Sequence, residues 1–369
     1  MKTYLLPLSI LVTIFFFIEG CKQNKPAQQE NLRTFVDTVG FAHYAWQMDS
    51  VGARVMRLDG ERITELRHSA GVDSSTTWRV AICPHDDYSY AGFLYPLVLD
   101  EVRSKTIILF GVAHKAKQFG LEDRIVFDDF PTWKGPYGPV KISPAREQLK
   151  KLLQADLFVM HDSMQIVEHS LEALIPWLQA NNRQIEILPI LVPYMSYERM
   201  NEIAGALAKA LKRIVKENKW EWGRDYSLVI STDAVHYGDE DWGGTNFAFY
   251  GADSAGYSKA IQHEQEIIGN CLAGEITPKK ILDFTNYTVR EEDYKNYKWT
   301  WCGRFSVPFG LLTAHYLEKD FDSKPCEGVF LGYATSIDHD TIPVSDLRMG
   351  RTALANIHHW VGYAAIGYK

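Results

Sequence analysis

Short apolar runs alternate with amphipathic segments from residue 78 to the end of the chain. Each run has the length of a buried strand and is bounded by polar or turn-forming residues. We therefore expect strands at residues 78–82, 106–110, 185–192, 228–231, 328–332 and 361–366. Strands that alternate with helices are typical of a helix-covered sheet. The pattern predicts an α/β fold with a central sheet flanked by helices on both faces.

The segments between these strands carry helix signals. The clearest begins at Ser196, a good capping residue, and its apolar side chains return with the helical period. These are Met200, Ile203, Leu207, Leu211 and Ile214. Ser143-Pro144 and Thr277-Pro278 predict two more helix starts, because proline is favoured in the first helical turn. Ser170 is expected to cap another helix. Further helices are expected over 54–66, 92–99, 251–274 and 306–317.

Composition supports a folded protein without a nucleic-acid partner. The 369 residues are 46% hydrophobic and 23% charged, which suits a substantial core. The formal net charge is −7, and long runs of Lys or Arg are missing from the sequence. We expect residues 35–369 to form a single domain, since neither a repeat nor a low-complexity block interrupts them.

The first 20 residues predict a secretory signal peptide. Lys2 precedes an apolar stretch, residues 5–18, that is short for a membrane span. Gly20 directly before Cys21 resembles a bacterial lipobox, which implies cleavage before Cys21 and a lipid on its thiol. The alternative is an ordinary signal peptide with a chance cysteine. Polar residues 21–34 would then be a tether. The expected location is the bacterial cell envelope, as a periplasmic or outer-membrane lipoprotein held to the membrane through Cys21.

Four cysteines follow Cys21: Cys83, Cys271, Cys302 and Cys326. A location outside the cytoplasm permits disulfides. The sequence leaves open whether Cys271 pairs with Cys326.

Histidines and acids stand just past the ends of three predicted strands. His85 follows the first strand, His114 the second, and Asp233 and His236 the run at 228–231. Ligands of open α/β sheets bind at the carboxyl ends of strands, so these side chains converge if the strands are neighbours. Each histidine taken alone is better explained by a structural role than by a catalytic one. Cys302 is a further candidate, because a thiolate near a helix N-terminus has a lowered pKa.

This set of residue types favours a metal site. Two histidines with one anionic ligand suit Fe(II) or Zn(II) and leave positions open for a substrate. A third histidine outside the ligand set could act as an acid or base.

Several blocks along the chain also match a known family in residue type and order. They are Pro84-His85-x-x-Tyr88-x-Tyr90-x-Gly92, Gly111-Val112-Ala113-His114, Glu168-His169-Ser170-Leu171-Glu172, Ser231-Thr232-Asp233-Ala234-Val235-His236-Tyr237-Gly238, Cys302-Gly303-Arg304 and Val361-Gly362-Tyr363-Ala364-Ala365. Together they resemble the MEMO family, also called AmmeMemoRadiSam system protein B. The resemblance implies a single domain with the fold of class III extradiol dioxygenases and a metal pocket.

The resemblance also implies roles for individual residues. The metal ligands correspond to His85, His114 and Cys302, and iron is the metal usually suggested. Copper or zinc would also suit a site that contains a thiolate. The matching His236 would move a proton beside the pocket, with Asp233 steering it.

Acidic residues beside these ligands have open roles. Asp86 and Asp87 stand where the family has Ala-Gly, and they could bind the metal, orient His85 or face water. Glu168 and His169 are expected to cap a helix or orient the pocket wall rather than bind the metal.

These observations predict a membrane-anchored, non-haem iron-dependent oxidoreductase or dioxygenase-like enzyme that acts on an unidentified small molecule. The main alternative is a lipoprotein that binds a metal or ligand without turnover; zinc-assisted hydrolysis is a third reading. The predicted envelope location argues against partnership with a cytosolic radical-SAM enzyme.

Overall fold

The strands of this protein form one extended sheet. The structure, a computed structural model, describes residues 32–321 and 324–369. Within these ranges the sheet has 13 strands. They are β1 (Leu32–Arg33), β2 (Val80–Cys83), β3 (Thr106–Val112), β4 (Ile125–Phe127), β5 (Thr132–Gly135), β6 (Gly138–Ile142), β7 (Phe158–Met160), β8 (Glu186–Val192), β9 (Tyr226–Ser231), β10 (His236–Gly238), β11 (Gly274–Glu275), β12 (Glu327–Thr335) and β13 (His359–Tyr368).

The middle of the sheet is parallel, and this places the ends of its strands together. The main path runs β1-β5-β6-β8-β3-β9-β2-β13-β12-β11. Strands β8, β3, β9 and β2 are parallel neighbours, whereas β13 and β12 complete the sheet in antiparallel order. Because β2, β3 and β9 point the same way, the residues that follow them meet at one edge of the sheet.

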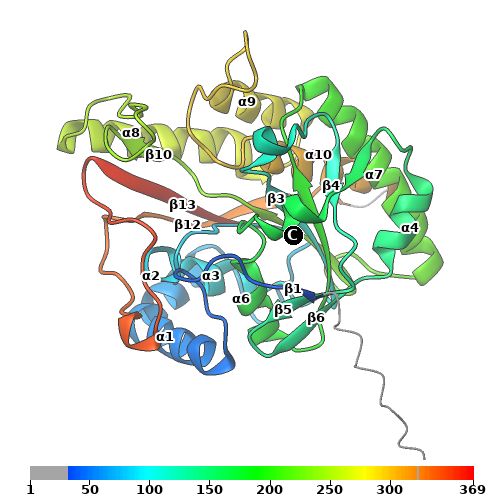
Figure 1. The fold of residues 1–369 in the computed structure, drawn as a ribbon, viewed down its shortest axis with the longest axis horizontal. Helices are drawn as coiled ribbons and strands as arrows, with labels where there is room; N and C mark the ends of the chain where they lie inside the picture. Colours follow the sequence, from blue (N-terminus) through cyan, green and yellow to red (C-terminus); the bar gives the residue numbers. More distant parts are fainter. Residues whose placement is uncertain (1–31, 322–323) are drawn as a thin grey trace, which may run out of the picture. The chain divides into compact units, whose positions relative to one another are not determined.

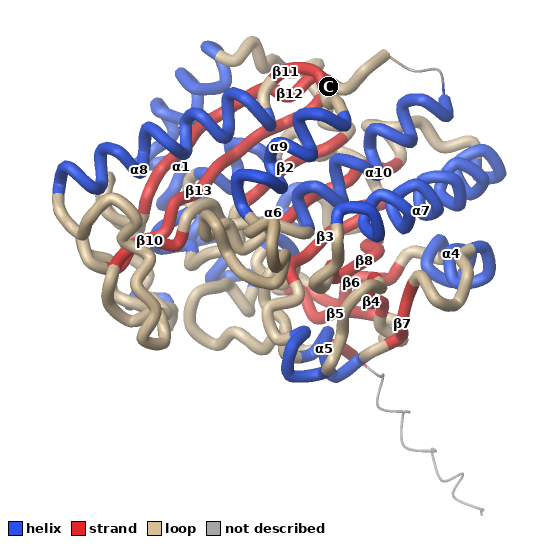
Figure 2. Tube along the Cα trace, turned by 90° about the horizontal axis from the view of Figure 1, so that it is seen from above, coloured by secondary structure: helices blue, strands red, loops and turns tan. Residues whose placement is uncertain are grey.

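Helices cover both faces of the sheet, as Figures 1 and 2 show. One face carries α4, α7, α8, α9 and α10, and the other carries α1, α2, α3 and α6. The helices are α1 (Ala45–Ser69), α2 (Tyr88–Ala91), α3 (Leu94–Leu99), α4 (Ala145–Leu152), α5 (Asp162–Ile166), α6 (Leu174–Asn181), α7 (Tyr197–Asn218), α8 (Ser254–Ile267), α9 (Pro278–Thr288) and α10 (Ser306–Phe321), with short 3-10 or π turns at Ala116–Phe119, Ile268–Leu272 and Ser345–Leu347.

Alternate residues of the central strands feed two separate cores. Val80 and Ile82 of β2 pack among the side chains of the α7 and α10 face. Ala81 and Cys83 of the same strand pack against the α1 and α3 face. Successive side chains of a strand point to opposite faces, so a strand that is apolar throughout must be covered on both sides. The predicted α/β fold with helices on both faces is therefore confirmed.

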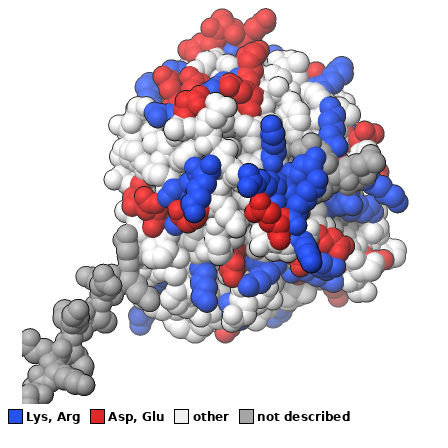
Figure 3. All heavy atoms as spheres, turned by 90° about the vertical axis from the view of Figure 1, so that its right-hand side faces the viewer, with Lys and Arg blue, Asp and Glu red and all other residues white. Residues whose placement is uncertain are grey.

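The long helix α7 is apolar on its buried side and charged on its exposed side. Helix α7 buries its apolar stripe and leaves charged pairs outside, such as Arg213 with Glu217 at 2.9 Å. Figure 3 looks at the side of the molecule that carries α4 and α7, where Lys and Arg lie interspersed with Asp and Glu. The Ser196 cap is confirmed, because its hydroxyl accepts from Arg199 N at 3.2 Å. Thr277 caps α9 in the same way.

One predicted helix start is wrong. Ser170 does not begin a helix: its hydroxyl donates to the carbonyl oxygen of Val112 at 3.1 Å, and α6 begins only at Leu174. Ser170 therefore ties this segment to the end of β3 and lies four residues before the helix that it was expected to cap.

Two residues of the predicted tether, residues 21–34, belong to the fold. Leu32 and Arg33 form β1, which pairs with β5. Arg33 is buried and pairs with the buried Glu172 at 2.5 Å. The predicted signal peptide and Cys21 lie outside the described residues. Across the ranges that are described, none of the helices combines the length and apolarity needed to cross a membrane. Cys271 and Cys326 are both free, buried thiols.

Candidate metal centre

His85 is held in one tautomer by a short hydrogen-bond chain. It lies two residues past β2, and its Nδ1 is 2.8 Å from the hydroxyl of Ser231. That hydroxyl donates its only hydrogen to the carbonyl oxygen of Ser170 at 2.6 Å. Nδ1 of His85 must therefore be the donor to Ser231, and Nε2 keeps its lone pair. Burial, reinforced by His114, holds the pKa of His85 well below its ordinary value, so the ring is neutral.

His114 is oriented by a carboxylate. It follows β3, and both its backbone N–H and its Nδ1 lie 2.8 Å from the two oxygens of Glu168. An ionised carboxylate only accepts, so Nδ1 donates, and Nε2 is the ring atom left to bind a metal. Burial alone would raise the pKa of Glu168, but the charge and hydrogen bond of His114 outweigh it and bring that pKa down to about 2. Glu168 thus orients a candidate ligand rather than capping a helix.

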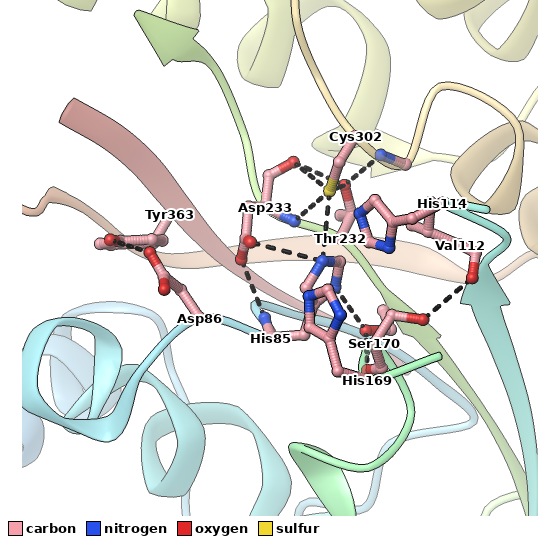
Figure 4. Close-up of polar contacts among 12 residues, drawn as sticks. His85, Asp86, Val112, His114, His169, Ser170, Thr232, Asp233, Cys302 and Tyr363 are labelled. Atoms are coloured by element: carbon pink, nitrogen blue, oxygen red, sulfur yellow. Dashed lines mark hydrogen bonds and ion pairs between the residues drawn. The ribbon is translucent and has the colours of Figure 1, made fainter. Parts of the chain in front are cut away.

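Cys302 reaches the same point from the other side (Figure 4). Its Sγ lies 3.5 Å from Nε2 of His85 and accepts the backbone N–H of Asp233 at 3.0 Å. Cys302 comes from the segment before α10, not from a strand. The expected lowering of its pKa by a helix N-terminus is wrong: burial and the nearby Asp233 raise the pKa of the Cys302 thiol.

Two overlapping groups could hold a metal ion, and they share His85. One is His85, His114 and His169; the other is His85, Asp233 and Cys302. Within each group the potential ligand atoms lie within 4.8 Å of one another. The predicted ligands His85, His114 and Cys302 all belong to these two groups, so the structure supports a His/His/Cys type of site. It adds His169 and Asp233 as neighbouring residues that could also bind the metal.

His169 lies closer to this centre than its expected wall position. Its ring stacks on that of His114 with centroids 4.8 Å apart, and it lies 5.5 Å from the ring of His85. Burial and His114 lower the pKa of His169. Glu168 and His169 were already candidate site residues from the sequence block. Only the structure shows that both side chains contact the ring of His114.

Asp233 and His236 both line the cavity at this centre. Asp233 accepts the backbone N–H of His85 at 2.9 Å, and burial raises the pKa of Asp233 to about 7. No hydrogen bond joins Asp233 to His236 in the part of the chain that the structure describes. His236 Nε2 is buried without a partner, and burial together with His114 lowers the pKa of His236 to about 3. His236 is therefore a neutral ring that can accept a proton or a hydrogen bond.

Asp86 and Asp87 neither face bulk water nor bond to the His85 ring. Asp86 accepts from the hydroxyl of Tyr363, and burial with Asp233 nearby raises the pKa of Asp86 to about 7. Asp87 accepts the backbone N–H and the hydroxyl of Thr352 at 2.5 and 3.0 Å. Burial and Asp86 raise the pKa of Asp87 to about 8. The Asp87 side chain thus ties the loop that contains Thr352 to the segment that contains His85.

These groups surround a cavity of about 510 Å³. His85, His114, His169 and His236 form part of its wall. Part of the remaining wall comes from residues outside the blocks recognised in the sequence, among them Phe41, Trp242 and His359. The rings of Trp242 and His359 stack with centroids 4.0 Å apart. Phe41 and Trp242 stand on loops, and local sequence patterns do not predict where such loops pack.

The fold and site define an α/β protein with a candidate metal centre at the carboxyl edge of a parallel sheet. Within that class, this chain belongs to the Memo-like protein family, whose model matches residues 56–347. The resemblance found from the sequence blocks is thereby confirmed.

Individual relatives agree with this assignment. The chain is 26% identical over 301 residues to a MEMO1 family protein of Pyrococcus horikoshii, covering 77% of this chain and 91% of the relative. A MEMO1 family protein of Pyrococcus abyssi is 27% identical over 296 residues, covering 76% and 89%. A third, from Aquifex aeolicus, is 30% identical over 161 residues, which is 43% of this chain and 54% of that protein.

Proposed function

We propose that this MEMO-family protein is a metal-dependent, dioxygenase-like oxidoreductase with non-haem iron held by His85, His114 and Cys302. One observation supports this most strongly. The Nδ1 atoms of both histidines are engaged by Ser231 and Glu168, which leaves both Nε2 atoms available, and Nε2 of His85 lies 3.5 Å from the Cys302 sulfur. Such outer partners are the usual means of fixing a metal-binding tautomer.

The donor set fits a redox-active ion. Two imidazoles suit iron, copper and zinc alike, while a thiolate favours the softer members of that range. We expect Fe(II), with copper or zinc as alternatives. Bound iron would supply one-electron chemistry and open positions for a small-molecule substrate.

The residues around this centre have separate tasks. His236, neutral and without a partner at Nε2, hydrogen-bonds substrate in the cavity and passes its proton on; its lowered pKa makes it a weak base, so the proton does not stay on the ring. Asp233 holds the backbone of His85 and the segment that leads to His236. The aromatic wall excludes water from the reacting groups. As to location, we propose a lipid on Cys21 and a cell-envelope protein that acts without a radical-SAM partner.

Metal analysis of anaerobically purified protein tests this proposal. His85→Ala and Cys302→Ser should each reduce bound iron to a small fraction of the wild-type content. Cys271→Ser is the matched control, because Cys271 is as buried as Cys302, at 4% exposure, but lies outside the site. Unchanged metal content in both site variants would refute the assignment.

A metal-binding lipoprotein without turnover is the second candidate. The observation in its favour is the Asp87–Thr352 contact, which fills with side chains a position where the family motif has glycine. Oxygen consumption by the iron-loaded protein over a panel of catechols separates the two. If the iron-loaded protein consumes no oxygen with any catechol of the panel, metal binding without catalysis is favoured.

A further inference from the structure

Glu264 of α8 is a fully buried carboxylate that lies outside the cavity wall. Its Oε1 accepts the indole N–H groups of Trp299 and Trp301 at 2.6 and 2.7 Å. Its Oε2 accepts the backbone N–H of Val235 at 3.2 Å and the hydroxyl of Tyr333 at 3.1 Å. Four donors from three separate segments therefore converge on one side chain.

Two of these donors are sequence neighbours of site residues. Val235 directly precedes His236, and Trp301 directly precedes Cys302. Val235 and Trp301 also form an isolated antiparallel bridge. His85 and His114 extend from strands that the sheet fixes, whereas the Cys302 segment has little ladder pairing of its own. Thr300 and Gly303 tie this segment to His236 and Thr232. The Glu264 carboxylate adds an attachment that holds Trp301 and Val235 together through one side chain.

The surrounding packing is arranged around this carboxylate. A Cβ at Gly362 of β13 would lie 2.2 Å from the Tyr333 hydroxyl and 3.3 Å from Glu264 Oε2. Glycine is thus required for the cluster to close. Burial raises the pKa of Glu264 to about 6, against the lowering effect of its donors. A buried carboxylate without a cationic partner is costly, so its presence here calls for a role that an apolar side chain would not serve.

We infer that Glu264 is a positioning residue, which sets the place of the Cys302 sulfur relative to the His85 and His114 rings by clamping Trp301 and Val235. This inference rests on the proposed metal site. Glu264 touches neither metal nor substrate and acts only through its neighbours.

Titration with Co(II) as the probe tests this role, because a cobalt–thiolate bond gives a charge-transfer absorption that reports directly on Cys302. Glu264→Gln keeps the shape of the side chain, but its amide NH2 must face at least one of the present donors. We expect Co(II) affinity to fall about 10- to 100-fold, as for other outer partners of metal ligands, and the charge-transfer band to weaken. Trp301→Phe removes the donor beside Cys302 and should act in the same direction.

Glu101→Gln is the matched control, because Glu101 is also buried, at 5% exposure, but pairs with Arg103 away from the cavity. It should leave the band and the Co(II) affinity unchanged. If Glu264→Gln and Trp301→Phe lower only the melting temperature, with wild-type affinity and band, Glu264 is merely structural and the inference fails. If wild-type protein itself binds Co(II) without a thiolate band, the proposed His/His/Cys site fails and this inference fails with it.

Discussion

Replacing Arg33 by methionine should destabilise the protein strongly, although Arg33 lies at the start of the described chain. Arg33 and Glu172 have side chains only 1% and 0% exposed. Arg33 also donates to the carbonyl oxygens of Gln165 and Glu168. Removing one partner of a buried pair leaves an uncompensated charge and typically costs about 3–5 kcal/mol.

The size of this effect can be bounded from the contacts that remain. In the Arg33→Met variant, Glu172 still accepts the backbone N–H groups of Val36 and Asp37 at 2.9 Å. These partly stabilise the carboxylate, so we expect the lower part of the range, about 3 kcal/mol. That is roughly a hundredfold change in the folding equilibrium. Adding Glu172→Gln removes the buried charge while keeping an acceptor, and the double variant should recover part of the loss.

Urea unfolding provides the assay, with Arg213→Met as control. The Arg213–Glu217 pair is exposed, at 66% and 53%, and its loss should cost less than about 1 kcal/mol. If Arg33→Met costs no more than this control, the buried pair does not anchor the N-terminal segment and the reasoning is refuted. Because Glu172 lies in the same turn as Glu168, metal content measured on the same samples shows whether the damage reaches the site.

Three further predictions concern the site. Glu168→Gln should weaken metal binding about 10- to 100-fold, because a glutamine amide has one acceptor oxygen and cannot accept from both the backbone N–H and the Nδ1 of His114; calorimetric titration with Zn(II) would show this, and an unchanged affinity would contradict it. The depressed pKa of Glu168, about 2 against an ordinary 4.5, contributes folding stability that is present above pH 4.5 and is lost as the pH falls toward 2. Urea unfolding across this pH range should show that the free energy of unfolding falls more steeply in the wild type than in Glu168→Gln. Parallel plots of unfolding free energy against pH would refute this prediction. Asp87→Ala should lower the free energy of unfolding by about 1–3 kcal/mol, because the Thr352 N–H loses its acceptor. Hydrogen exchange of the Thr352 amide should become faster, and unchanged protection of that amide would contradict a stabilising Asp87–Thr352 contact.

Much of the fold follows from residue patterns alone. Strands β2, β3 and β9 contain apolar runs, so they were expected to lie between two helical layers, and the residues after them were expected to meet if these strands were neighbours. The partners of His85, His114 and Asp233 were beyond reach for a different reason. Which acceptor a histidine finds depends on segments distant in sequence: Ser231 is 146 residues from His85.

The errors share this origin. Ser170 has the local features of a helix cap, yet its hydroxyl bonds Val112 across the sheet edge. Leu32 and Arg33 follow a polar stretch, and only their pairing with Thr132 and Trp133 makes them a strand. Local propensity is a weak guide wherever a tertiary contact offers a better partner.

The division of the cavity wall between strand ends and loops has an evolutionary consequence. His85 and His114 directly follow strands whose register the whole sheet maintains, whereas Trp242 and Thr352 stand on loops that few strands constrain. Mutations in those loops can change which molecules the cavity admits, while the residues that follow the central strands stay the same. Members of one lineage can thus diverge in what they admit long before they diverge in how they react.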